Sequence, residues 1–438
     1  MNYNEQYKNK LITVDEALSK VQSNIDIVVG LAAIEPFDFL SRLHEIADRV
    51  ENVSILTCLN MGNYEFTSNP DMKGHFRNTT WFYTPTTRRA HPYGTATYIP
   101  NHLHLSARDR LSYKKPNIFI ATATPMDKHG YFNLSLSATY EKSMLEEADI
   151  VMLEVDPNYP RTFGDTNVHI SQVDFVYETG RPIPIFPYAP SSDKDRAIGE
   201  YIADLIEDGS TIQLGIGGIP NAVTGALMNK KELGVHTELF NDGMVDLIEA
   251  GVITNSRKTL HKGVSIATMA LGSEKLYDFI DQNPGVAIMN GCYVNDPYVI
   301  GQNYKQVSIN TTLEVDLTGQ CCSESLGVRQ FSGTGGQADT AIGAQNSIGG
   351  KSIIALYSTT VNKKTGEQIS KIVTTLAPGA AVSLQRNDVD YVVTEYGVAR
   401  LTGKSILERV DELISIAHPD FREDLRKEAN KLMLWSLY

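Results

Sequence analysis

The hydrophobic pattern of the chain alternates between two kinds of segment. Short apolar runs that end at glycine or polar residues predict β-strands, and apolar residues spaced three or four apart predict helices. In the first part of the chain, strands are predicted over residues 26–31, 53–59, 118–122 and 150–155, and helices over residues 13–21, 37–50 and 140–148. This order is typical of a parallel sheet with helices on both faces.

The same alternation restarts after four prolines between residues 182 and 190 and the polar stretch 191–196. Further helices are predicted over residues 197–206, 222–230, 244–250, 274–281, 404–417 and 421–433, and strands over residues 211–214, 235–240, 264–269, 286–289, 352–357, 371–375, 381–384 and 391–393. We therefore expect an α/β protein of two related open domains with mostly parallel sheets, residues 1–188 and 189–438. The active site is expected in the cleft between them.

Residues 60–111 do not follow the alternation and are too long for a plain connection, so we expect them to carry small elements of their own or a function. Their polar side chains include Arg88, His91, His102 and His104. These could contact an acyl group or a carboxylate, although such residues are more often surface or structural groups.

One complete β-α-β unit is predicted over residues 211–243, with the sequence TIQLGIGGIPNAVTGALMNKKELGVHTELFNDG. A glycine-rich turn follows the first strand, and Pro220 and Asn221 suit the start of a helix. Glu238 is predicted at the end of the second strand, with Asp242 as the cap of the next helix. The turn and the carboxylate should share the carboxyl edge of one sheet, where ligands bind and a helix N-terminus suits an anion. Pattern alone also fits an ordinary turn and a solvated glutamate.

Two nucleotide-binding motifs are excluded. A dinucleotide fingerprint would need glycine where Pro220 stands, and the Gly-Lys-Ser sequences at residues 350–352 and 403–405 lack the glycine five positions earlier that a P-loop requires.

Composition narrows the function further. A net charge of −13 over 438 residues argues against nucleic acid as the main partner, because a phosphate backbone needs a basic face. The four cysteines lack metal-site spacing, and no metal is expected. We see neither a signal peptide nor an apolar run long enough to cross a membrane, so no membrane association and a cytoplasmic location are expected.

Several motifs together resemble the acetyl-CoA hydrolase/transferase family of CoA-transferases, especially its 4-hydroxybutyrate and butyryl-CoA:acetate CoA-transferase branch. The motifs are GIGGIPNAV at residues 215–223, HTE at 236–238, DGMVD at 242–246, FSGTGGQ at 331–337, DVDYVVTEYGV at 388–398 and HPDF at 418–421. Residues 60–111 match less well.

The resemblance implies an enzyme that moves coenzyme A between carboxylic acids, with acyl-CoA and a short-chain carboxylate as substrates, no tightly bound cofactor, and a homodimer. It implies that Glu238 is catalytic. The positions that it matches to CoA binding are Gly215, Ile216, Gly217, Gly218, Ile219, Leu313, Gly335, Gly336 and Gln337. Gln337 could instead orient a carbonyl.

A carboxylate is a poor electrophile, so exchange of CoA between two acids needs a covalent relay. Glu238 would attack the thioester and form a mixed anhydride, and CoA would then attack Glu238 to give a glutamyl-CoA thioester. The best-matching acids are butyrate or 4-hydroxybutyrate with acetate. An acyl-CoA hydrolase using the same CoA site, a non-catalytic protein that binds CoA esters, and a sugar-phosphate isomerase on a related fold remain alternatives.

Overall fold

The computed structural model describes residues 2–186 and 190–436 and separates into two units. The first unit comprises Met1–Pro187, Ile266–Val294 and Phe331–Gly335; the second comprises Tyr188–Ser265, Asn295–Gln330 and Gly336–Tyr438. The domain boundary predicted between residues 188 and 189 lies outside the described residues.

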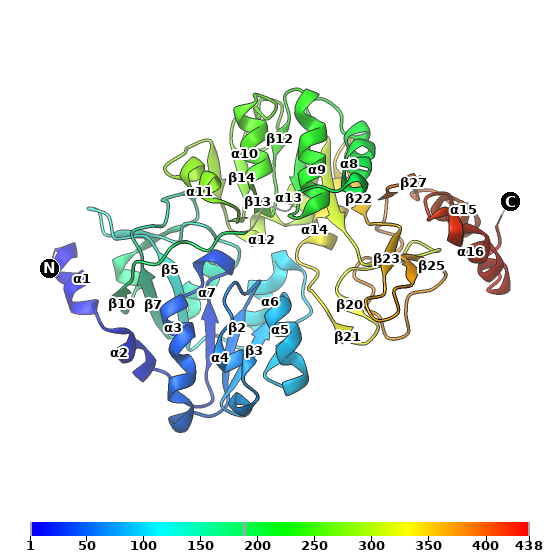
Figure 1. Ribbon diagram of the computed structural model, residues 1–438. Helices are drawn as coiled ribbons and strands as arrows, with labels where there is room; N and C mark the ends of the chain where they lie inside the picture. The colour runs from blue at the N-terminus through cyan, green and yellow to red at the C-terminus, as the bar shows by residue number, and fades with distance from the viewer. Residues whose placement is uncertain (1, 187–189, 437–438) are drawn as a thin grey trace. The chain divides into compact units, whose positions relative to one another are not determined.

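Seven strands form the sheet of the first unit, in the order β10-β7-β5-β1-β2-β3-β4. Figure 1 labels β10, β7, β5, β2 and β3 of this sheet. Their bounds are β1 (Asp26–Val29), β2 (Val53–Thr57), β3 (Phe76–Thr80), β4 (Ala96–Tyr98), β5 (Ile118–Ala123), β7 (Ile150–Val155) and β10 (Phe175–Glu178). Every neighbouring pair is parallel. The parallel sheet expected from the sequence is confirmed, because each apolar run is buried on both faces as a covered parallel strand requires.

The α-helices of the first unit are α1 (Tyr3–Lys10), α2 (Val14–Ser19), α3 (Phe37–Arg42), α4 (Glu65–Ser68), α5 (Pro85–Ala90), α6 (Ser106–Tyr113), α7 (Glu141–Glu147), α11 (Glu274–Ile280) and α12 (Gly291–Val294). Thr13 caps α2 and shares a capping box with Glu16. The helix predicted over residues 37–50 is correct only for its first part, since the chain tightens into a 3₁₀ helix over Leu43–Arg49. The small elements expected in residues 60–111 are present as β3, β4, α4, α5 and α6.

Six strands form the main sheet of the second unit, in the order β12-β11-β17-β22-β26-β27. Their bounds are β11 (Thr211–Leu214), β12 (Gly234–Val235), β17 (Gln306–Thr311), β22 (Lys351–Ala355), β26 (Tyr391–Thr394) and β27 (Gly397–Arg400). All pairs are parallel except β26 with β27, which form a hairpin at one edge. The two-part, mostly parallel α/β organisation predicted from the sequence is therefore confirmed.

The α-helices of the second unit are α8 (Asp193–Leu205), α9 (Gly218–Ala226), α10 (Asp242–Glu249), α13 (Pro297–Gly301), α14 (Gln337–Asn346), α15 (Ile406–Ser415) and α16 (Pro419–Lys431). Helix α14 packs on β17 and β22, and α8 packs on α9 and β26.

The remaining short strands are β6 (Tyr131–Asn133), β8 (Phe163–Gly164), β9 (Asn167–His169), β13 (Leu239–Phe240), β14 (Ser265–Ala267), β15 (Met269–Ala270), β16 (Val286–Ile288), β18 (Glu314–Asp316), β19 (Cys321–Cys322), β20 (Ser325–Leu326), β21 (Arg329–Gln330), β23 (Thr359–Val361), β24 (Gln368–Ser370) and β25 (Ile372–Val373). The strand predicted over residues 381–384 is wrong. The backbone bonds of this segment go to Cys321 alone, from the N–H groups of Ser383 and Leu384, and form a single bridge. The N–H of Ala381 bonds to the Ser325 side chain, so no ladder extends along the segment.

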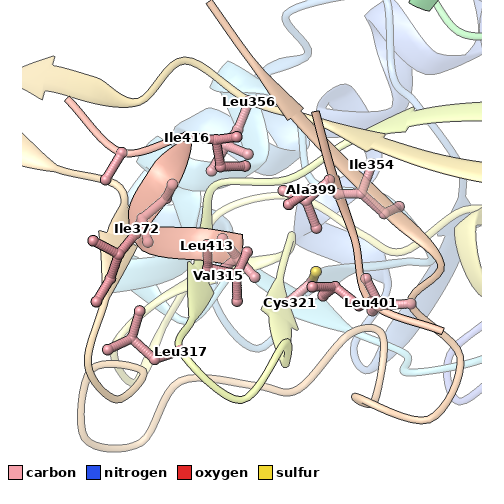
Figure 2. Close-up of a cluster of buried hydrophobic side chains, with 14 of the residues drawn as sticks. Val315, Leu317, Cys321, Ile354, Leu356, Ile372, Ala399, Leu401, Leu413 and Ile416 are labelled. Atoms are coloured by element: carbon pink, nitrogen blue, oxygen red, sulfur yellow. The ribbon is translucent and has the colours of Figure 1, made fainter. Parts of the chain in front are cut away.

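A buried apolar cluster joins the sheet of the second unit to its last helices (Figure 2). Ile354 of β22 and Ala399 of β27 lie with Leu413 of α15 and with Val315 of β18 in this cluster. Each of these side chains is fully buried, so the C-terminal helices gain their stability from contact with the sheet.

Candidate functional site

The glycine-rich turn at residues 215–219 links β11 to α9 as predicted. Gly217 has a φ of 119° and precedes the first turn of the helix, a backbone conformation that favours glycine. A Cβ at Gly218 would lie 2.8 Å from an oxygen of Asp195, whereas a Cβ at Gly215 or Gly217 would meet nothing within 4 Å. The turn therefore needs glycine for packing on one side and leaves open space on the other. Ile216 is partly exposed beside that space, whereas Ile219 is buried.

The strand predicted over residues 235–240 is wrong as one element. The chain pairs with β11 only over Gly234–Val235, leaves the sheet, and forms a separate short strand at Leu239–Phe240. Glu238 lies in the bend between them, so it precedes a strand instead of ending one. Two hydrogen bonds explain the interruption: the side-chain amide of Gln306 donates to the carbonyl of His236, and the Thr237 hydroxyl donates to the carbonyl of Leu239. Glu238 still follows the carboxyl end of β12, the parallel neighbour of β11.

Helix α10 is capped by Asn241, so the prediction of Asp242 as its cap is wrong. The Asn241 side chain accepts a hydrogen bond from the N–H of Met244 at 3.2 Å and donates one to the carbonyl of Gly215 at 2.8 Å. An amide can do both, whereas an ionised carboxylate can only accept. Asn241 thereby ties the glycine-rich turn to the segment that carries Glu238.

Two donors hold the carboxylate of Glu238. The side-chain amide of Asn295 donates to Oε2 at 2.9 Å, and the backbone N–H of Gly336 donates to the same carboxylate. A Cβ at Gly336 would lie 2.1 Å from both Asn295 Nδ2 and Glu238 Oε2. Only glycine therefore permits this close approach of backbone to carboxylate.

The environment raises the pKa of Glu238 to about 7. Removal of water from around the carboxylate is the largest cause, and the nearby charge of Asp339 adds to it, while the bonds from Asn295 and Gly336 oppose it. Glu238 nevertheless keeps part of its surface exposed. A carboxylate that is half ionised near neutral pH and still accessible can act as a nucleophile or a base.

Asn295 is a residue of this site that sequence reasoning missed. It stands 57 positions after Glu238, in a Val-Asn-Asp-Pro sequence that is typical of a turn. Its side chain is 1% exposed, and its Oδ1 has no hydrogen-bond partner within residues 2–186 and 190–436. No local pattern in the sequence distinguishes it from a structural asparagine.

The second glycine-rich loop passes from one unit to the other between Gly335 and Gly336. In the first unit, the Arg88 side chain donates to the carbonyl of Phe331 at 2.5 Å and lies 3.7 Å from the centre of its ring. A Cβ at Gly333 would lie 2.4 Å from the carbonyl of Trp81. These contacts hold the loop before it reaches Gly335, which has a φ of 51°.

Gln337 begins α14 directly after Gly336. Its amide donates to the carbonyl of Thr311 at 2.9 Å, and its Oε1 is buried without a partner in the described part of the chain. Leu313 is partly exposed, just past the end of β17, and its N–H bonds to the carbonyl of Cys322. The structure thus gives Gln337 a structural bond and leaves the predicted CoA contacts of Leu313, Gly335, Gly336 and Gln337 as predictions.

The predicted polar residues of segment 60–111 are bound within the first unit. Arg88 holds the second glycine-rich loop, and the ring of His91 bonds to the Tyr83 hydroxyl at 2.8 Å. The rings of His102 and His104 lie 6.1 Å apart. Arg88 and His91 therefore have structural roles that the sequence did not separate from substrate binding.

Among residues 2–186 and 190–436, no cluster of three His, Cys, Asp or Glu side chains has the geometry to hold a metal ion. None of the helices described there has the length and apolar character needed to cross a membrane. The arrangement around Glu238 combines an accessible carboxylate of raised pKa with two N–H donors on that carboxylate. This arrangement suits a carboxylate that first attacks a substrate as a nucleophile and is then itself attacked at its carboxyl carbon.

Comparison with known proteins identifies a family that covers most of the chain. The acetyl-CoA hydrolase/transferase N-terminal domain matches residues 1–187, and the C-terminal domain of the same family matches residues 272–429.

Several curated relatives align along nearly the whole chain, among them two CoA transferases. One is the succinyl-CoA:cyclohexane-1-carboxylate CoA transferase of Geobacter metallireducens, 44% identical over 431 residues, covering 98% of this chain and 97% of that protein. The other is the 4-hydroxybutyrate coenzyme A transferase of Clostridium kluyveri, which is 43% identical over 441 residues. That alignment covers 98% of this chain and 100% of the relative. Among solved structures, RipA from Yersinia pestis superposes with a TM-score of 0.91 at 34% identity, covering 99% of this chain and 100% of that one.

Proposed function

This chain belongs to the acetyl-CoA hydrolase/transferase family, and on that premise we propose that it exchanges coenzyme A through a covalent intermediate on Glu238. It is a CoA-transferase that acts between short-chain acyl-CoA and carboxylate. The proposal concerns the nucleophile, the path of the acyl group and the choice of acids.

One observation carries the proposal: the carboxylate of Glu238 is held by Asn295 and by the N–H of Gly336, at a distance that no side chain on residue 336 would permit. Any buried carboxylate is stabilised by a backbone N–H bond of this kind. A reacting glutamate needs it, because its oxygen becomes an oxyanion each time the carboxyl carbon is attacked.

The first half-reaction takes two substitutions. An ionised oxygen of Glu238 attacks the thioester carbonyl, the carbon–sulfur bond breaks, and CoA leaves as thiolate with the bonding electrons. The product is a mixed anhydride between the acyl group and Glu238. The thiolate then attacks the carboxyl carbon of Glu238, the anhydride carbon–oxygen bond breaks, and the first acid leaves as a carboxylate, which gives a glutamyl-CoA thioester.

The second half-reaction runs both substitutions in reverse with the incoming acid, so ping-pong kinetics are expected. Attack on the carboxyl carbon of Glu238 places negative charge on the oxygen that Asn295 and Gly336 contact. Preorganised donors of this kind typically contribute about 10²–10³ in rate each. We assign these two donors to the glutamyl oxyanion, and the glycine-rich turn at residues 215–219 to CoA, together with Leu313, Gly335 and Gln337.

For the acids, we propose butyrate or 4-hydroxybutyrate as one partner and acetate as the other. The match to the Clostridium kluyveri transferase supports this choice. The Geobacter metallireducens transferase is equally similar and its name gives different acids, so a panel of acids is part of the test.

The test traps the intermediate. The protein is incubated with butyryl-CoA or acetyl-CoA, treated with borohydride, digested and analysed by mass spectrometry. We expect Glu238 to be reduced to an alcohol only when acyl-CoA is present, since borohydride reduces a thioester and leaves a free carboxylate intact. The Glu238→Ala variant is the matched control and should yield neither the modified peptide nor turnover.

A wild-type protein that turns over acyl-CoA but leaves Glu238 unmodified would overturn the covalent path and favour direct hydrolysis. Transfer and hydrolysis are separated by following total thioester: added acetate should stimulate turnover of butyryl-CoA without loss of total thioester. A panel of C2 to C6 acids with and without a 4-hydroxyl group then fixes the acids.

A further inference from the structure

Strand β12 lies at the edge of the six-stranded sheet, and Glu238 follows it by three residues. An edge strand normally leaves one row of N–H and C=O groups facing solvent. On its inner side, β12 is bonded to β11: the N–H of Gly234 donates to Ser210 and that of His236 to Ile212. The peptide groups of Val235 point to the outer side, where Leu233 makes one backbone bridge to Ile253 but the pairing does not continue alongside Val235 within the described residues.

Two side chains take the place of the missing strand. The side-chain oxygen of Asn255 accepts the N–H of Val235 at 2.9 Å, and Lys258 Nζ donates to the carbonyl of Val235 at 2.7 Å. Lys258 Nζ also donates to the carbonyl of Val264 at 2.6 Å. One ammonium group therefore joins the outer edge of β12 to the far end of the loop 255–264.

The side chain of Lys258 is built into this position. It is 4% exposed, and its stem passes so close to Gly234 that a Cβ there would lie 2.4 Å from Lys258 Cγ. Within residues 2–186 and 190–436 no carboxylate pairs with it, which is unusual for a buried lysine. Its polar partners are carbonyl groups, so its role is to bind backbone.

Burial lowers the pKa of Lys258 to about 7, and His261 is the titratable group whose own pKa responds to its charge. A neutral amine still carries two N–H groups, as many as the carbonyls of Val235 and Val264 require. The link to Val235 therefore does not depend on the charge of Lys258.

Asn255 is held in turn. Its backbone is left-handed, with a φ of 56°, and its side-chain amide donates to Ser265 Oγ at 2.9 Å. The loop 255–264 thus presents an acceptor and a donor to Val235 from a fixed frame. On the other side of the strand, Gln306 donates to the carbonyl of His236 at 3.1 Å. The peptide groups of Val235 and His236 are therefore hydrogen-bonded by side chains on opposite sides of the strand, just before the chain bends to Glu238.

We propose that Lys258 and Asn255 are positioning residues for the reaction: by holding the Val235 peptide they fix the path of residues 236–238 and keep the Glu238 carboxylate against Asn295 and Gly336. The inference rests on the proposed role of Glu238. It adds two residues that touch neither the carboxylate nor the substrate.

Loss of the hydrogen bonds from Lys258 and Asn255 to Val235 should slow the chemical step and leave the binding of acyl-CoA unchanged. The glycine-rich turn at residues 215–219 directly continues β11, which is paired with β17 on the side away from β12 and Lys258. A displacement of a reacting group by about 1 Å costs on the order of 10²-fold in rate. The expected signature is a fall in kcat at nearly constant KM.

The experiment compares Lys258→Met with Lys258→Arg in the full chain. Methionine keeps an apolar stem beside Gly234 and removes the donors, whereas arginine retains N–H donors. Lys231→Met is the matched control, because Lys231 is an exposed lysine shortly before the same strand. For each protein we would measure kcat, KM for butyryl-CoA, the yield of borohydride-trapped Glu238 and the fraction folded by circular dichroism.

We expect Lys258→Met to lose about 10²-fold in kcat per folded molecule with KM changed less than threefold, Lys258→Arg to recover at least tenfold of that loss, and Lys231→Met to behave as wild type. A folded Lys258→Met protein with kcat within threefold of wild type would overturn the proposal. So would a loss of activity accounted for by the unfolded fraction alone.

Should Lys258→Met not fold, Asn255→Gly decides, since glycine keeps the left-handed backbone and removes the acceptor for the Val235 N–H together with the donor to Ser265 Oγ. We expect at least a tenfold fall in kcat at constant KM, and an unchanged kcat would refute the proposal. Trapping on the wild-type protein tests the nucleophile separately from the positioning role. If Glu238 is trapped but the variants keep their kcat, the positioning role of Lys258 and Asn255 is refuted and the nucleophile assignment stands. If Glu238 is not trapped, the nucleophile assignment fails and the positioning role fails with it.

Discussion

Substitution of Gly336 by alanine should be among the most damaging changes that a single methyl group can make in this enzyme. The new Cβ would stand 2.1 Å from both Asn295 Nδ2 and Glu238 Oε2, whereas ordinary contact begins near 3.4 Å. Asn295 is buried and hydrogen-bonded to Glu238, so these two side-chain ends would have to retreat by roughly 1.3 Å or the backbone of residue 336 would have to move instead.

Either response breaks the arrangement on which the proposed reaction through Glu238 depends. Retreat of the carboxylate displaces the nucleophile by more than 1 Å, which costs on the order of 10²-fold in rate. Movement of the backbone withdraws the N–H of Gly336, and loss of one oxyanion donor costs about 10²–10³-fold. Backbone strain is not the cause, because Gly336 has a φ of −94° that alanine also adopts. We therefore expect kcat to fall by about 10²–10³-fold.

The assay is steady-state turnover of butyryl-CoA with acetate, together with the yield of borohydride-trapped Glu238. Gly225→Ala in α9 is the control, because a Cβ there would meet nothing within 4 Å, and it should leave kcat unchanged. A Gly336→Ala protein with kcat within threefold of wild type would show that the carboxylate does not need this contact. The reasoning from geometry to rate would then be refuted.

Two further predictions follow from the raised pKa of Glu238. Because the attacking form is ionised and the pKa is about 7, kcat/KM should rise nearly tenfold per pH unit below 7 and level off above it; a profile flat between pH 5.5 and 8 would contradict this. Glu238→Gln should also stabilise the fold at pH 8 relative to pH 5. The folded carboxyl resists ionisation between about 4.5 and 7, which costs the wild type at most about 3 kcal/mol above pH 7. Urea unfolding at the two pH values measures the difference, and a pH-independent difference would count against the assigned pKa.

The fold was largely predictable because its signals are local. Buried parallel strands such as β5 and β7 are continuous apolar runs, and their ends coincide with turn residues. Prediction failed where side chains replace backbone pairing. The strand 235–240 is interrupted because Gln306, far along the chain, takes the carbonyl of His236. No periodicity in residues 235–240 records that partner.

Of the candidate site, the sequence indicated only the local part, and the roles of those residues stay predictions. Glu238 and the turn 215–219 stand close together in sequence, and family motifs mark both. Asn241 replaced Asp242 as the helix cap because a second acceptor, the carbonyl of Gly215, required an amide donor. Asn295 and Lys258 were not predicted because their roles depend on contacts with residues distant in the sequence. A single asparagine or lysine in a sequence does not indicate such contacts.

The edge of β12 bears on how this chemistry can be transplanted. A short His-Thr-Glu motif looks like a portable unit, yet here the loop 255–264 finishes the strand that precedes it, and Asn295 and Gly336 arrive from distant segments. The smallest segment to transfer into another protein is therefore residues 211–265 in one piece. The receiving protein must supply a side-chain amide and a glycine N–H from its own loops. Scaffolds whose edge strand is already paired would leave no room for that segment.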